Sequence, residues 1–220
     1  SNYQMTLRFM AGAMGVPFLP TRSGLGTDLI EKWGFSPETR AADPKLPDDK
    51  LQVMDNPFGD WGNMPKVVLV PAINPDVTII HVQKAGPKGT SRIEGLPFSD
   101  VEQAKSAEHL IVTYEELVET DQLRGAPESN QIPFFCVDAV VPLPHGAYPT
   151  ACYNHYDYDP VYLNDYKKFA SDDALYPGYL NQFIHGVKDH KALLEKIGKD
   201  RLNAIKADPR TGYATGLDRK

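Results

Sequence analysis

The sequence predicts an α/β fold built on an open, mostly parallel sheet with helices on both faces. Four short runs are rich in β-branched residues and lack a regular alternation of polar and apolar residues: 66–72, 77–82, 110–113 and 137–141. Strands that are covered on both faces have this pattern, and such strands are typical of parallel sheets. Helical patterns occur before and between these runs, which is the arrangement of an α/β protein.

The first element is predicted to be a buried helix at 5–14. Apolar residues recur there with the period of a helix, at Leu7, Met10 and Met14. Gly15 occupies the position at which glycine commonly ends a helix, and Pro17 would stop any continuation.

Between this helix and the last strands, the sequence predicts one long loop and one connecting helix. The segment 41–65 is rich in Pro, Asp and Gly and is expected to be mostly loop. A compact domain keeps so long a loop only for a functional or packing reason. The helix is predicted at 99–107, because Ser99 and Glu102 have the spacing of a capping box, and it would connect two strands of the sheet.

The last third of the chain has a different composition. After Pro149 it is rich in Tyr, Asp and Asn, and two polar helical stretches follow at 161–170 and 178–197, the second interrupted near Asp189. We therefore predict an α/β domain over residues 1–150. Residues 151–220 would form a Tyr-rich, helical C-terminal extension that packs on the same domain or on a partner protein.

Composition limits the class of protein. The 220 residues carry a net charge of -6 and are 41% hydrophobic and 24% charged, which is ordinary for one globular domain. Scattered Lys and Arg argue against nucleic-acid binding, and no apolar run reaches the length of a membrane span. No signal peptide is recognised, so a cytoplasmic protein is expected. Cys136 and Cys152 are too few for a disulfide framework and are expected to be reduced and structural.

The loop at 17–34 is the first candidate for ligand contact. Two prolines stiffen it, and the cation Arg22 precedes a turn of small residues. One interpretation is a plain strand-to-helix turn with Thr27 or Asp28 as the helix N-cap. The other is a binding loop, in which backbone N–H groups at a helix N-terminus hold an acyl or carboxylate oxygen. Arg22 would then pair with a carboxylate in a bidentate fork, although a solvated or structural arginine is the alternative.

Two further loops follow predicted strands, at 83–90 and 143–149. Because ligands in open α/β sheets bind outside the carboxyl ends of the strands, we expect both loops and the 23–27 loop to lie on one edge of the sheet. For the 83–90 loop the alternative is a plain turn with Lys84 and Lys88 in water.

No metal site is predicted. The spacing of the candidate ligands matches no recognised motif, and the segment that holds most of them is equally well explained as a surface turn with aromatic anchors. Those ligands would be His145, His155, Asp157, Asp159 and His185. His81 lies within a β-run and is expected to be a hydrogen-bonded core or edge histidine.

The order and spacing of several strings carry a family resemblance. They run as MGVPFLPTRSGLGTD, LPDDKLQVMDNPFGD, DVTIIHVQKAGPKGT, IVTYEELVE, CVDAVVPLPHGAYPTACYNHYDYD and VKDHKALLEKIGKDRL. Together they resemble the A (α) subunit of family I CoA-transferases of the glutaconate CoA-transferase type, over nearly the whole chain. Subunits of this family begin with a strand-rich, glycine-containing segment that has no counterpart here. The resemblance therefore implies that residues 1–150 are the C-terminal part of the main domain of such an α subunit.

The resemblance implies a function. Such an enzyme moves CoA between a (di)carboxylic acyl-CoA and an acceptor acid, through a glutamyl-CoA thioester on its partner, the B (β) subunit. It would be a hetero-oligomer with no permanently bound cofactor and with coenzyme A as a substrate. No catalytic residue is expected in this chain, because no glutamate has a nucleophile's setting. Glu102, Glu108 and Glu195 are predicted on polar helix faces, and Glu115, Glu116 and Glu119 at a helix start after a strand.

The chain would instead supply substrate-binding residues. The expected ones are Arg22, Ser23, Gly24, Leu25, Gly26, Thr27, Gln83 and Gly146. The sequence departs from the family at Tyr148, where a histidine is usual, and at His145, where an aromatic residue or glycine is usual. Arg22 has no obvious counterpart in the glutaconate type, and its loop is closer to relatives that open steroid-derived rings as CoA thioesters.

Two alternatives stay open. The same fold can serve a CoA-thioester hydrolase, ring opening included, in which water replaces the acceptor acid. A non-catalytic scaffolding role is the other alternative. A glutamate in the nucleophile loop of the partner would favour transfer, and its loss would favour hydrolysis or scaffolding.

Overall fold

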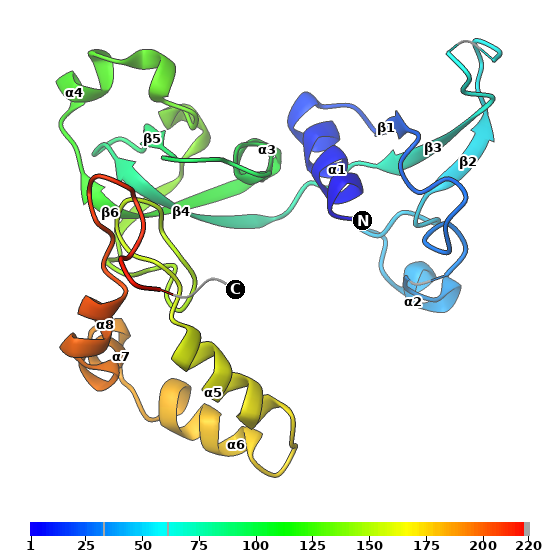
Figure 1. Cartoon of the computed structure of the whole chain (residues 1–220). Helices are drawn as coiled ribbons and strands as arrows, with labels where there is room; N and C mark the ends of the chain where they lie inside the picture. The colour runs from blue at the N-terminus through cyan, green and yellow to red at the C-terminus, as the bar shows by residue number, and fades with distance from the viewer. Residues whose placement is uncertain (33, 61, 218–220) are drawn as a thin grey trace.

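The computed structural model describes residues 1–32, 34–60 and 62–217. Two sheets organise the chain, and Figure 1 shows them in two lobes, with a group of helices extending below the second lobe. We call them the antiparallel sheet, with the strand order β1-β3-β2, and the parallel sheet, with the order β5-β4-β6-β7. The prediction of a mostly parallel α/β sheet is confirmed for the second lobe, in which β4, β6 and β7 run parallel.

The first helix, α1 (Asn2–Met14), packs on the antiparallel sheet. Its N-terminus has a capping box between Ser1 and Gln4, and its C-terminus ends at Gly15, whose left-handed φ of 70° suits glycine. Leu7 and Ala11 are buried. The predicted buried helix is therefore confirmed, although Met14 at its end is exposed.

The antiparallel sheet was not predicted. It consists of β1 (Phe18–Thr21), β2 (Gln52–Asp55) and β3 (Lys66–Pro71), with β3 in the middle. The assignment of 66–72 to the parallel sheet was therefore wrong. The residues of β3 are apolar on both faces, so the sequence resembles a strand of a parallel sheet, and only the burial of the side chains alternates along the strand. Val68 and Val70 are buried toward α1, and Val67 and Leu69 lie on the other face. The prediction that 41–65 is mostly loop missed β2; the short helix α2 (Pro37–Ala42) ends inside that segment.

The parallel sheet holds the largest core. Its strands are β4 (Val77–Ala85), β5 (Ser91–Arg92), β6 (His109–Leu117) and β7 (Ala139–Pro142). Helix α3 (Asp100–Ser106) lies along one face, where the buried cluster includes Ile80, Val82, Leu110 and Val112. The predicted capping box is wrong in detail, because the hydroxyl of Ser99 accepts a hydrogen bond from the Gln103 side chain instead.

Short elements connect β6 to β7. They are α4 (Thr120–Arg124) and the 3-10 turns η1 (Pro127–Ser129) and η2 (Phe134–Cys136). On the face of the parallel sheet opposite α3, the loop that follows β7 lies over the carboxyl end of β6, where His145 N and Gly146 N donate to Glu115.

The two lobes meet where α1 packs against α3. The backbone N–H of Ile73, between the two sheets, donates to Arg8 O at 3.0 Å, and Asn74 donates to Ser106 O at 3.0 Å. Gly12 approaches this junction so closely that a Cβ atom there would lie 2.3 Å from Ile73 O.

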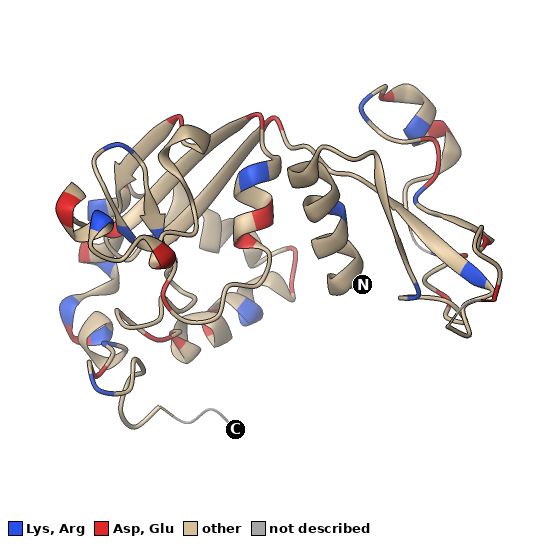
Figure 2. Cartoon of the chain, turned by 90° about the horizontal axis from the view of Figure 1, so that it is seen from above, with Lys and Arg blue, Asp and Glu red and all other residues tan. Residues whose placement is uncertain are grey.

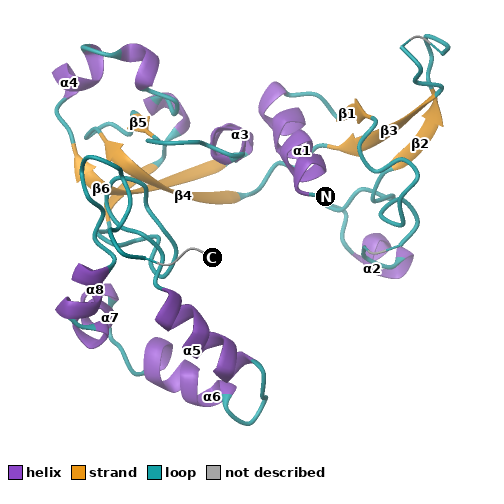
Figure 3. Ribbon diagram, in the orientation of Figure 1, coloured by secondary structure: helices purple, strands orange, loops and turns teal. Residues whose placement is uncertain are grey.

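The C-terminal helices extend away from the parallel sheet, as Figure 3 shows. They are α5 (Pro160–Ala170), α6 (Tyr176–Tyr179), the π-helix η3 (Leu180–His185), α7 (His190–Ile197) and α8 (Lys199–Ala204). The predicted helix at 161–170 and the interruption near Asp189 are confirmed, since Asp189 caps α7 with a bond from Ala192 N. Helix α8 was not predicted, and the domain boundary at residue 150 stays a prediction.

Basic and acidic residues are mixed along the chain, and Figure 2 shows their positions interspersed along the ribbon of both lobes. Within the described ranges, no helix is long and apolar enough to cross a membrane.

Candidate functional site

The Arg22–Thr27 loop follows β1 and is built from tight turns. Leu25 N donates to Arg22 O at 3.2 Å, and Thr27 N to Gly24 O at 3.1 Å, while Gly24 and Gly26 have φ values of 95° and 73°. No helix begins at Thr27 or Asp28, so both the predicted N-cap and the predicted helix N-terminus for an anion are wrong. The glycines close the turn on itself, and the next helix starts only at Pro37.

Helix α1 holds this loop in place. The buried side chain of Gln4 donates to Ser23 O at 2.8 Å. Gly24 lies directly against this amide, since a Cβ atom at Gly24 would lie 2.7 Å from Gln4 Nε2. The position of the loop therefore depends on Gln4 of α1 and on the absence of a side chain at Gly24.

Beside the loop, the outer face of the antiparallel sheet is hollowed into a pocket of about 490 Å³. We call it the apolar pocket; its wall includes Phe18, Met54, Phe58, Val67 and Leu69, with Arg22 as its cation. Within the described part of the chain, the Arg22 guanidinium has no hydrogen-bond or ion-pair partner. An unpaired arginine beside an apolar pocket can receive a carboxylate.

The Gln83 side chain is hydrogen-bonded within the protein, and its role in substrate binding stays a prediction. Its side-chain oxygen accepts from Glu94 N at 2.9 Å, and its nitrogen donates to Glu94 O at 3.2 Å and to Tyr153 O at 3.3 Å. The residue is buried, and its amide joins β4 to two loops. A ligand would have to displace these bonds.

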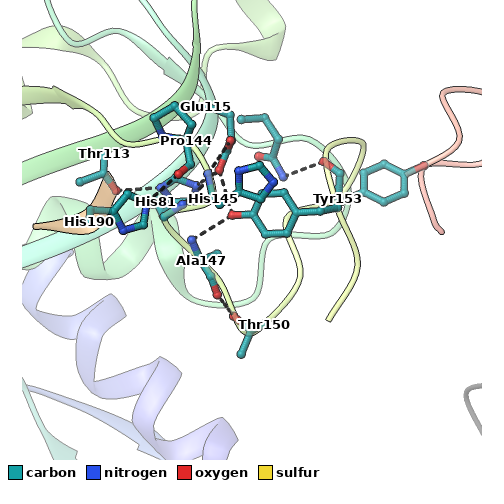
Figure 4. Close-up of polar contacts among 12 residues, drawn as sticks. His81, Thr113, Glu115, Pro144, His145, Ala147, Thr150, Tyr153 and His190 are labelled. Carbon is teal, nitrogen blue, oxygen red and sulfur yellow. Dashed lines mark hydrogen bonds and ion pairs between the residues drawn. The ribbon is translucent and has the colours of Figure 1, made fainter. Parts of the chain in front are cut away.

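Gly146 lies in a network around Glu115. Figure 4 shows His81, Thr113, Glu115 and His145 of this network. The Glu115 carboxylate accepts four hydrogen bonds: from His81 Nε2 at 2.8 Å, Tyr156 Oη at 2.8 Å, His145 N at 3.0 Å and Gly146 N at 3.3 Å. His81 Nδ1 also lies 2.8 Å from Thr113 Oγ1. The network joins β4, β6, the loop after β7 and Tyr156. The expectation of a hydrogen-bonded His81 is confirmed.

Glu115 is held as a carboxylate. Burial alone would raise its pKa, but the bonds from His81, from the His145 backbone and from Tyr156, with the charge of His81, outweigh burial and lower the pKa to about 2. Its side chain is 6% exposed. A carboxylate surrounded by four donors is a poor nucleophile, because attack would forfeit those bonds.

The predicted positions of the glutamates need correction. Glu115 and Glu116 lie within β6 rather than at a helix start, and only Glu119 begins a helix, as the N-cap of α4. The burial of Glu115 was missed, since a polar pair such as Glu115–Glu116 at the end of a strand resembles an exposed strand end.

Replacing Gly146 with alanine should destabilise this network. A Cβ atom at Gly146 would lie 2.6 and 2.7 Å from two atoms of the His81 ring and 2.8 Å from Leu143 O, so the ring or the loop must shift, and both donate to Glu115. We expect a loss of roughly 1–3 kcal/mol, the usual cost of overpacking. Chemical denaturation measures it. Gly26→Ala is the control, because nothing lies within 4 Å of its Cβ position and its cost is one of backbone conformation alone. If Gly146→Ala unfolds like the parent protein, the ring is not confined as described.

His145 and Cys152 are adjacent to this network, whereas Cys136 packs against the core cluster of the parallel sheet. His145 stacks on Tyr156 with ring centroids 4.8 Å apart, has a φ of 59°, and its Nδ1 is buried without a partner among the described residues. Burial lowers the pKa of His145, and burial raises the pKa of Cys152 to about 12. Both cysteines are free, and the thiol of Cys136 also has a raised pKa because of burial, which fits structural roles.

One side-chain group in the described ranges has the proximity of a metal site. The ligand atoms of His81, Glu115 and Cys152 lie within 4.8 Å of one another. The donor set does not suit an ion, because Glu115 already accepts four bonds and the Cys152 thiol stays protonated. Among the candidate ligands weighed from the sequence, Asp159 accepts from Arg201 Nε at 2.5 Å and from Tyr148 Oη at 2.7 Å.

The three predicted loops do not share one edge. The 83–90 and 143–149 loops follow β4 and β7 at the carboxyl edge of the parallel sheet, whereas the 23–27 loop follows β1 in the antiparallel sheet. The structure therefore separates Arg22 to Thr27 from Gln83 and Gly146.

Comparison with known proteins decides the family. The model of the family described as Coenzyme A transferase matches residues 2–142. The chain belongs to the coenzyme A transferase family. The resemblance predicted from the sequence strings is thereby confirmed.

Relatives within this family can be compared with the chain. It is 43% identical to the A (α) subunit of glutaconate CoA-transferase of Acidaminococcus fermentans, over 92% of this chain and 62% of the relative. It is 28% identical to the IpdA subunit of the cholesterol ring-cleaving hydrolase of Rhodococcus jostii, over 87% of this chain and 62% of the relative. A crystal structure of the Acidaminococcus fermentans glutaconate coenzyme A-transferase superposes with a TM-score of 0.88 at 41% identity, over 97% of this chain and 66% of that chain.

The chain of this CoA-transferase family member thus spans about three fifths of the length of the curated relatives it matches. The superposition extends over the C-terminal helices as well as both sheets, since it covers 97% of the chain.

Proposed function

We propose that this chain is part of the α subunit of a heteromeric CoA-transferase, which moves CoA between a carboxylic acyl-CoA and an acceptor acid. The observation that carries the proposal is the superposition on glutaconate coenzyme A-transferase with a TM-score of 0.88. A partner β subunit would complete the enzyme, and coenzyme A would act as a substrate rather than as a bound cofactor.

The chemistry of the chain agrees with a nucleophile on the partner. Glu115 is deeply buried, ionised and saturated with donors. A carboxylate that attacks an acyl-CoA must be free to form a new bond. We therefore assign the covalent step to a glutamate of the β subunit.

The contribution of this chain would be substrate binding. Arg22 has no partner in the described ranges and lines the apolar pocket, so we propose that it receives a carboxylate of the acyl group. Ser23, Gly24, Leu25, Gly26 and Thr27 would complete this wall of the site. Gln83 and Gly146 would act indirectly, by fixing the carboxyl edge of the parallel sheet.

The hydrolase alternative is less favoured. The hydrolase relative is 28% identical to this chain, against 43% for the glutaconate CoA-transferase relative. The free thiols fit a reducing compartment, and we propose a cytoplasmic location.

The chain alone should have no CoA-transferase activity, because no glutamate in the described ranges has a nucleophile's setting. The measurement is an exchange assay with an acyl-CoA and acetate, run with the chain alone and with the chain co-expressed with the β subunit. Activity should need both. Turnover by the chain alone, with a hydroxylamine-sensitive thioester on one of its own glutamates, would contradict the proposal. Formation of free CoA in place of exchange would favour the hydrolase.

A further inference from the structure

The outer face of the antiparallel sheet is apolar although no described element covers it. A sheet with one face on the core normally turns polar residues to the other face. Here Val68 and Val70 face α1, but the opposite side carries Val67 and Leu69 from β3, with Met54 paired to Val67 across the strands. Met54 remains 42% exposed. Burial of this face by something else would therefore be favourable.

The connection between β2 and β3 gives the face a rim. Asn56 fixes it, because Asn56 N donates to Pro65 O at 2.8 Å and its side chain donates to Met64 O at 2.8 Å. Phe58 lies in this connection, lines the apolar pocket and is 84% exposed. A large apolar ligand in the pocket would cover the Phe58 ring.

The size of the pocket bears on the ligand. Its volume of about 490 Å³ lies within the roughly 300–1,000 Å³ of sites for drug-sized molecules. A five-carbon dicarboxylic acid has about nine non-hydrogen atoms, which fill roughly half of this volume even at the ~30 Å³ that a water molecule occupies. The pocket is therefore large for a short diacid.

We infer that the apolar pocket binds the acyl group of the substrate, and that this group is a long or bulky hydrocarbon ending in a carboxylate that pairs with Arg22. The inference rests on the proposed function and adds the substrate class to it. The hydrocarbon would cover Met54, Phe58 and Leu69, and the charged end would meet the unpaired cation of the wall.

The test narrows the pocket without touching Arg22. Met54→Trp places a larger ring on the pocket side of β2, and Val53→Trp is the matched control, because Val53 is the adjacent residue and pairs with Val68 on the α1 side. Both side chains are about equally exposed, at 42% and 39%. Thermal unfolding shows whether each variant folds like the parent chain.

The probes are dodecanedioic acid and glutaconic acid, titrated by calorimetry into the chain, and their CoA thioesters, assayed with the chain and the β subunit. We expect the parent chain to bind the longer acid at least about tenfold more tightly, given about 0.8 kcal/mol per buried methylene. Met54→Trp should lose at least about tenfold of that binding and of kcat/KM for the long thioester. Val53→Trp should keep both.

The outcomes separate the two proposals. In one outcome the parent chain binds the long acid, Met54→Trp weakens this binding, and no thioester supports CoA transfer. This outcome overturns the proposed function and leaves the pocket as a carboxylate site. The inference is overturned if kcat/KM is higher for the short thioester than for the long one. It is also overturned if Met54→Trp and Val53→Trp change kcat/KM for the long thioester equally. A third result also overturns the inference: the parent chain does not bind the long acid, and Met54→Trp no longer assembles with the β subunit. The outer face of the antiparallel sheet is then an interface between the two subunits.

Discussion

Replacing Glu115 with alanine should lower the free energy of unfolding by about 3–5 kcal/mol, the usual result when one partner of a buried charged network is removed. Four donors would lose their acceptor, among them His81 Nε2 and Tyr156 Oη. For a chain of 220 residues this is a fall in Tm of about 10 °C. Glu116→Ala is the control, because Glu116 is the next residue of β6 and is 52% exposed. Similar melting of both variants would contradict the network.

The same carboxylate should make stability depend on pH. The pKa of Glu115 is about 2 in the folded chain, below its ordinary value of 4.5. The unfolded chain therefore takes up the proton first, so the stabilisation is complete above about pH 5 and is lost as the pH falls toward 2. The side chain is 6% exposed, so the shift corresponds to about 3 kcal/mol. In Glu115→Gln the loss of stability between pH 5 and 2 should be smaller by about this amount, as denaturant unfolding at each pH would measure. An unchanged slope would contradict it.

Replacing Arg22 with alanine should reduce the preference of the assembled enzyme for carboxylated acyl groups by a factor of about ten to a hundred. Loss of a charge-assisted pair costs about 1.5–3 kcal/mol. The experiment compares kcat/KM for a dicarboxylic acyl-CoA with its monocarboxylic analogue of equal length. Arg22→Lys should recover part of the loss, because it keeps the charge but not the planar fork.

Arg124→Ala serves as the control for Arg22, since Arg124 is an exposed arginine of α4 in the other lobe. Arg124→Ala should leave kcat/KM for both substrates unchanged. An equal loss on both substrates in Arg22→Ala, or no loss on either, would show that acid recognition lies elsewhere.

Local signals in the sequence were sufficient for part of the fold. The C-terminal glycine of α1, the strands β4, β6 and β7 and the break before α7 each depend on neighbouring residues, and each was predicted, whereas the two-residue strand β5 was not. The antiparallel sheet depends on the pairing of Gln52 with Leu69 and of Phe18 with Pro71, which is distant in sequence. A run such as KVVLVP has apolar residues on both faces, so it does not reveal in which sheet it lies.

The Glu115 network could not be predicted from the sequence for a different reason. Its members come from β4, β6 and the segment that ends in Tyr156, and the parallel pairing of β4 with β6, which places His81 beside Thr113, brings the first two together. One signal was available: Thr113 and Glu115 are two residues apart in a strand and so share a face. The partner that buries this face is more than 40 positions away, measured from Thr113 to Tyr156, and no local pattern indicates it.

The contact at Gly12 has a consequence for the connection between the two sheets. Most helices pack through side chains that can change rotamer. Helix α1 instead contacts the main chain of Ile73 through Gly12, whose side chain is a single hydrogen atom. Backbone against backbone leaves no rotamer to adjust. Any side chain at position 12 would therefore force a shift of the main chain at Ile73, which lies in the connection between the two sheets.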